Sequence, residues 1–83
     1  GREIENLEES VREKVKSLQR TYLGLWADAL QRARPDMDRA TARIRVQLVA
    51  GLVNSARYVL HWADLDELRK DVTKMALAAF FVE

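Results

Sequence analysis

The stretch RATARIRVQLVAGLVNSARYVLHW, from Arg39 to Trp62, decides the fold of this chain. It is long enough for roughly six helical turns, and at 100° per residue its apolar side chains fall on two adjoining faces. One face carries Ile44, Leu48, Gly51, Leu52, Ser55, Tyr58, Val59 and Trp62. The other carries Val46, Val49, Val53, Ala56 and Leu60. A narrow polar stripe remains, made of Arg43, Gln47, Asn54, Arg57 and His61 and interrupted by Ala50.

A helix that is apolar over so much of its circumference has to be covered on both sides. The chain has 83 residues, which is enough for one domain with a small core. Domains of this size often gain stability by oligomerising. We therefore expect the chain's own helices to cover one side of the segment. A second copy, or a missing part of a longer chain, would cover the other.

The composition narrows the class of protein. With 48% hydrophobic and 33% charged residues the chain is globular, and its net charge of +1 gives no electrostatic case for a nucleic-acid patch or an anionic membrane surface. The absence of cysteine removes disulfides, thiol chemistry and zinc-thiolate sites, and fits a cytoplasmic protein. No apolar run approaches the roughly 20 residues of a membrane span. Because the chain starts at Gly1 without an initiating Met, we expect a fragment of something longer.

The first helix is predicted from about Ile4 to Ala33. Apolar residues recur there at three- and four-residue steps, while the other faces of its first half are charged or polar. Gly24 inside this helix has two interpretations, close packing against another helix or a kink that divides the helix in two. The stripe consists of Ile4, Leu7, Val11, Val15, Leu18, Tyr22, Leu25, Trp26, Ala29 and Ala33.

The segment Arg34 to Asp38 breaks the helical pattern at Pro35. Asp38 is the predicted N-cap of the second helix, which ends near Trp62, and so short a link predicts that the first two helices are antiparallel neighbours. Asp64 is the predicted N-cap of a third helix that runs to about Phe81. Its apolar stripe is Leu65, Leu68, Val72, Met75, Ala76 and Ala79. The sequence therefore predicts an all-α domain of three helices spanning residues 1–83.

The chain has few residues that could carry out catalysis, and we expect no enzyme, cofactor or metal site. His61 is the only histidine, and no phosphate-binding loop or nucleophile-base arrangement is visible. Asn54 lies mid-helix among aliphatic residues, where it is either a solvated or backbone-bonded side chain or a polar anchor at the rim of an apolar pocket. Tyr22 and Trp26 are four residues apart, and they are either core or the lining of a cavity for an apolar ligand.

The run LWADALQRARPDMDRATARIRVQLVAGLVNSARY, residues 25–58, resembles the C-terminal regulatory domain of the tetracycline-repressor (TetR) family. Similar regulators have a helix that ends in LW-x₃-L-x-R, then the turn RPD, then a helix with AR-x-RV and GL-x-NS. The matching positions are Leu25, Trp26, Leu30 and Arg32, then Arg34, Pro35 and Asp36, then Ala42, Arg43, Arg45, Val46, Gly51, Leu52, Asn54 and Ser55. The match covers about half of the chain, and the flanks agree only in pattern.

The resemblance implies a homodimer in which the last two helices form a four-helix bundle with the same pair of a second subunit. It also implies that the helix of Tyr22 and Trp26 borders a pocket for a small apolar effector. The helix-turn-helix that reads DNA in this family is absent from this chain, so DNA would be bound only through a missing domain. A change in the spacing of the two subunits would then release the operator DNA.

These inferences give two sets of candidate residues. For the ligand pocket we predict Tyr22, Trp26 and Asn54. The predicted dimer interface is Leu52, Ser55, Val59, Val72, Met75, Ala76, Ala79 and Phe80. Two alternatives remain, a helical oligomerisation module without a ligand and a small all-helical dimeric enzyme of the chorismate mutase type. The enzyme needs arginine in a charged interior site, and the inward stripes of this chain lack arginine and lysine.

Overall fold

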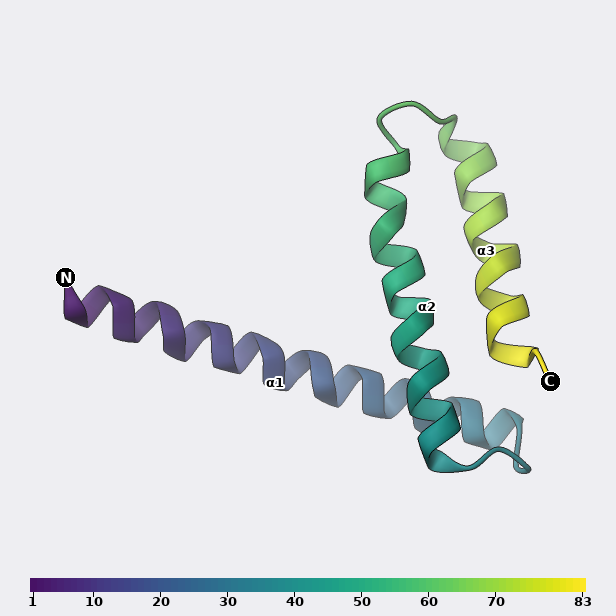
Figure 1. Ribbon diagram of the computed structural model, residues 1–83, viewed down its shortest axis with the longest axis horizontal. Coiled ribbons are helices and arrows are strands. Elements are labelled where there is room, and N and C mark those ends of the chain that lie inside the picture. The colour runs from purple at the N-terminus through teal and green to yellow at the C-terminus, as the bar shows by residue number, and fades with distance from the viewer.

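The computed structural model describes residues 1–83 as three helices, α1 (Arg2–Ala33), α2 (Arg39–Val59) and α3 (Leu65–Phe81), with no strand. Figure 1 shows α2 and α3 as an antiparallel hairpin and α1 crossing the base of α2. The molecule measures 50 × 37 × 13 Å, so its three helices form a flat, L-shaped arrangement. The prediction of an all-α chain with three helices is confirmed.

Both predicted N-caps are confirmed. The Thr41 backbone N–H donates to the Asp38 carboxylate at 2.7 Å, and the Glu67 backbone N–H donates to the Asp64 carboxylate at 3.1 Å. These caps satisfy backbone donors that have no partner within the first turn of a helix. The predicted end of α2 near Trp62 is wrong, because the helix stops at Val59. The N–H groups of Trp62 and Ala63 both donate to the Val59 carbonyl, which turns the chain toward the Asp64 cap.

The Asp38 cap predicts a pH dependence. Hydrogen bonding from Thr41 lowers the pKa of the Asp38 carboxyl below its ordinary value of 3.8. A carboxyl with a lowered pKa in the folded state stabilises the fold above its unfolded pKa, and this contribution is lost as the pH falls through the folded pKa. Asn is an equally good N-cap but does not titrate. We therefore expect the stability difference between wild type and Asp38→Asn, measured by urea denaturation, to be constant near neutral pH and to change below about pH 4. A difference that does not vary with pH would contradict this role.

The predicted antiparallel packing of the first two helices is wrong, because α1 and α2 cross steeply (Figure 1). Every residue from Gly1 to Tyr22 is exposed, and the buried residues of α1 are Ala27 and Leu30. A short connection makes two helices neighbours, but side-chain packing sets the angle between them. Here the small side chains of Ala27 and Ala42, both fully buried, allow a close crossing.

The core lies at this crossing and is small. Its buried residues are Ala27, Leu30, Met37, Ala42 and Val46, with Leu23 and Phe80 packed against them. Val49, one turn further along α2, is also buried, and these six are the only buried residues of the chain. Nineteen large apolar side chains remain exposed. Most of the large apolar residues therefore lie outside this small core.

Gly24 lies inside an uninterrupted α1, so the alternative of a kink that divides the helix is wrong. A Cβ atom at Gly24 would meet only the Arg39 guanidinium, at 3.9 Å. The same guanidinium donates to the Gly24 carbonyl at 3.3 Å and forms an ion pair with Asp28. Arg39 therefore fastens the start of α2 onto α1.

Two arginines hold the C-terminal end of α3. The Arg45 guanidinium, from α2, donates to the carbonyls of Phe80 (3.1 Å) and Val82, and Arg34 donates to the Val82 carbonyl at 3.0 Å. The last carbonyls of a helix have no partner within it, and cations at this end are also favoured by the helix dipole. Arg34 and Arg45 thus fix α3 against the link between α1 and α2.

Candidate functional site

The three predicted ligand residues line one groove between α1 and α2. Tyr22, Trp26 and Asn54 all border an open groove of about 550 Å³, which we call the aromatic groove. It lies between α2 and residues 15–26 of α1, two helices whose directions diverge from the crossing (Figure 1). The remaining lining residues are Val15, Leu18, Gln19, Leu23, Gln47 and Ala50. Six of its nine lining residues are hydrophobic, which suits an apolar ligand with few polar groups.

The polar stripe of α2 is the side of the helix that faces α1. Gln47, Ala50 and Asn54, at steps of three and four residues, bring its middle section into the aromatic groove. The stripe and its interruption at Ala50 are visible in the sequence, from which only Asn54 is predicted to border a pocket. The interruption was the available clue, because a small apolar residue within a polar stripe indicates contact with something other than water.

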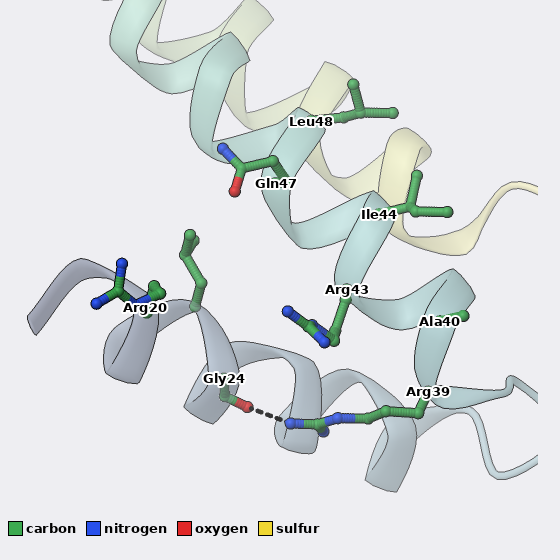
Figure 2. Close-up of a pocket in the computed structure, with 9 residues that line it drawn as sticks. Arg20, Gly24, Arg39, Ala40, Arg43, Ile44, Gln47 and Leu48 are labelled. Atoms are coloured by element: carbon green, nitrogen blue, oxygen red, sulfur yellow. Dashed lines mark hydrogen bonds between the residues drawn. The ribbon is translucent and has the colours of Figure 1, made fainter. Parts of the chain in front are cut away.

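A second groove, which we call the arginine groove, lies along the start of α2 (Figure 2). Its volume is about 720 Å³, and Arg20, Arg39 and Arg43 line it together with Gln47 and apolar side chains. Arg39 is already paired with Asp28, whereas Arg20 and Arg43 form no ion pair. No carboxylate, histidine or hydroxyl lines this groove, so it holds no general acid, general base or nucleophile.

Trp26 links the aromatic groove to the end of α3. Its ring lies 6.5 Å from the Phe80 ring, centroid to centroid, in a tilted arrangement. Both rings border a third pocket of about 350 Å³, whose seven lining residues are all hydrophobic and come from the ends of α1 and α3. Aromatic pairs in this arrangement attract one another beyond the area they bury. The Trp26–Phe80 pair therefore joins the end of α1 to the tip of α3.

The eight predicted interface residues divide into two groups. Six are half-buried in the single chain, and two, Ser55 and Met75, are exposed. The half-buried residues are Leu52, Val59, Val72, Ala76, Ala79 and Phe80. They occur on α2 and α3, which pack against one another, and Phe80 also contacts the core. The hairpin thus already uses much of the surface that the sequence analysis assigned to a second subunit.

The two apolar faces of α2 have different environments. On one face Val46 and Val49 are buried and Ala56 is half-buried, whereas Val53 and Leu60 are exposed, so the chain covers that side only in part. On the other, a line of exposed residues recurs at steps of four and three along the helix and past its end; we call it the bare face. It consists of Ile44, Leu48, Gly51, Ser55, Tyr58 and Trp62. A Cβ atom added at Gly51 would have no neighbour within 4 Å, so nothing in the chain approaches this face there.

Comparisons with known proteins add no assignment. The sequence matches no model of a known protein family, and neither curated proteins nor solved structures gave a match. The side chains form no group of three or more histidine, cysteine, aspartate or glutamate residues that could hold a metal ion. None of the helices combines the length and the apolar character needed to cross a lipid bilayer.

Proposed function

We propose that this chain is the ligand-sensing and dimerisation domain of a transcriptional repressor similar to those of the TetR family. Two copies associate through their α2–α3 hairpins in a four-helix bundle, and a small apolar effector binds in the aromatic groove. In this proposal the chain does no chemistry. DNA binding belongs to a domain that is not part of this sequence.

The bare face of α2 is the observation that carries this proposal. Its residues follow the four-three spacing by which one helix packs along another. Leu48, its second residue, is 67% exposed, and Gly51 and Ser55 follow it as small residues that allow two helices to approach closely. Exposed apolar surface of this regularity is typical of an interaction site. A second α2 is the occupant favoured by the resemblance to TetR regulators.

The crossing of α1 and α2 supplies a mechanism for sensing. A ligand in the aromatic groove contacts Tyr22 and Trp26 on α1 and Asn54 on α2, so it acts on the angle between the two helices. An effector that binds one angle more tightly than another shifts the population toward it by its difference in binding free energy. Arg39 and the contact of Trp26 with Phe80 link α1 to the hairpin, so such a shift reaches the dimer interface.

Sedimentation of a matched pair of variants tests the dimer. Leu48→Arg places a charge on the bare face, whereas Leu60→Arg makes the same change at a leucine that is 48% exposed and lies off that face. An unpaired charge in a dry interface costs several kcal/mol, so Leu48→Arg should raise the dissociation constant about 100-fold or more. At micromolar concentration we expect its weight-average mass to be at most half that of Leu60→Arg. Equal masses would show that the bare face is not an interface.

A helical assembly module without a ligand is the second candidate, and the openness of the aromatic groove favours it, since Tyr22 is exposed to solvent. Thermal unfolding in the presence of uncharged apolar compounds separates the two candidates. A sensing domain predicts a raised Tm for wild type that is lost in Tyr22→Ala and kept in Leu25→Ala, an exposed control outside the groove. A module predicts no change in Tm for any compound.

A further inference from the structure

The N-terminal part of α1 is an uncovered helix with an apolar side. All of residues 2–22 are exposed, and no other helix lies alongside them (Figure 1). We call this segment the arm. Five of its apolar side chains share one side of the helix and are between 47% and 65% exposed: Ile4, Leu7, Val11, Val15 and Leu18. A regular apolar line of this length on a charged helix is typical of a helix that pairs with another helix.

The spacing of these five residues is the same in both directions. From Ile4 to Leu18 the steps are three, four, four and three residues, so the pattern is symmetric about Val11. Two such arms placed antiparallel and centred on Val11 therefore bring apolar residues opposite one another along the whole line. Ile4 of one copy faces Leu18 of the other, Leu7 faces Val15, and Val11 faces Val11. This antiparallel pair has a two-fold axis perpendicular to the helices, which a parallel pair lacks.

The charges of the arm select the same arrangement. Residues 2–10 carry four glutamates and one arginine, for a net charge of −3, and residues 12–20 carry four basic residues and one glutamate, for a net charge of +3. In an antiparallel pair each acidic half lies against a basic half, whereas a parallel pair sets like charges side by side. Glu8 and Arg12 lie one turn apart on the same flank, so each Glu8 comes close to the partner's Arg12. The present partner of Arg12 is Glu9, in an exposed pair that is easily exchanged.

We propose that the arm is a self-association surface, on which a second copy of this chain binds as an antiparallel helix centred on Val11. The inference goes beyond the proposed function and does not need it, because it uses none of the residues of the bare face. A two-fold contact of this kind places the same surface on both copies. A chain with two such surfaces assembles into a closed tetramer or an open array.

The arm contact also bears on the aromatic groove. Val15 and Leu18 line this groove as well as the arm. In the proposed pair they face the partner's Leu7 and the partner's Ile4, which then form the outer wall of a groove that is open in the single chain. A second copy thus contributes side chains to the site in which we place the ligand.

Single cysteines test this arrangement, because the chain has none of its own. The variants are Ile4→Cys, Val11→Cys and Leu18→Cys, with Glu13→Cys on the opposite side of the helix as the control, each in the Leu48→Arg background that disables the bare face. In a glutathione redox buffer, disulfide formation reports equilibrium proximity. Facing Cα atoms of two packed helices are about 4–6 Å apart, which is within the range of a disulfide.

We expect Val11→Cys alone to form a disulfide dimer, with a yield about ten-fold or more above Glu13→Cys. Ile4→Cys and Leu18→Cys should each form no disulfide dimer, because their equivalents lie about 21 Å apart in the antiparallel pair. A mixture of these two variants should form the mixed dimer. Self-cross-linking at all three positions would indicate a parallel pair. A yield no higher than that of Glu13→Cys at every position would show that a second copy does not bind to the arm; either result overturns the proposal.

Discussion

Replacing Val46 with aspartate is expected to unfold the chain. Val46 is fully buried in the core cluster at the crossing of α1 and α2. A carboxylate at this position would lose its hydration without gaining a partner, which costs several kcal/mol. A core this small supplies at most about 5 kcal/mol of stability. Far-UV circular dichroism and urea denaturation should therefore show lost helicity and no cooperative transition.

Val53→Asp is the matched control for this prediction. Val53 lies two turns further along α2 and is 46% exposed. Its replacement by aspartate makes the same change of residue and charge as Val46→Asp. Aspartate has a lower helix propensity than alanine by less than about 1 kcal/mol, and this term applies equally to both variants. We expect Val53→Asp to keep a cooperative transition. If Val46→Asp also unfolds cooperatively with a similar midpoint, the crossing is not the core of the molecule.

Replacing Phe80 with alanine has the second largest expected effect. Phe80 is half-buried, packs against the core and lies against the Trp26 ring. Truncating a fully buried phenylalanine to alanine costs about 3–5 kcal/mol of folding stability, so we expect a loss of about 2–3 kcal/mol for the half-buried Phe80. Trp26 is already 49% exposed, and removing the Phe80 ring would expose it further. In a Trp62→Phe background, which leaves Trp26 as the only tryptophan, its fluorescence should shift to longer wavelength in the folded state.

The neighbouring Phe81 supplies the control. It carries the same side chain in the same helix and borders the same apolar pocket, but it is 50% exposed. Phe81→Ala should cost about 1 kcal/mol or less and leave the fluorescence of Trp26 unchanged. Equal losses for Phe80→Ala and Phe81→Ala would mean that the end of α3 does not pack against α1 in the way described.

Local features of this fold were predictable from sequence. Asp38 and Asp64 were identified as caps because capping depends on a side chain and a backbone donor three residues apart. The relative placement of the helices was not predictable in the same way. The steep crossing depends on Ala27 and Ala42 meeting across a five-residue link, and the Arg45 contact with the Phe80 carbonyl joins residues 35 positions apart. Neither contact leaves a periodic pattern in the sequence.

The residues of the candidate site were predictable from sequence, but their arrangement in space was not. Tyr22, Trp26 and Asn54 were selected separately, for their residue types and positions on two helices, and the fold places them around one groove. The arginine groove was not expected, since the inward stripes contain no arginine. Arg20 and Arg43 reach it from the polar faces of α1 and α2, and only the crossing angle brings these faces together. The periodic pattern that predicts the interface residues does not show how much of them the packing of α2 against α3 covers.

The crossing makes α1 a lever with its fulcrum near Ala27. From Ala27 to Arg2 the helix extends about 38 Å, at 1.5 Å per residue, with nothing in the chain holding its far end. A rotation of about 10° at the fulcrum therefore carries that end through about 7 Å. The start of this helix is thus displaced by far more than Tyr22 and Trp26, which lie beside the fulcrum.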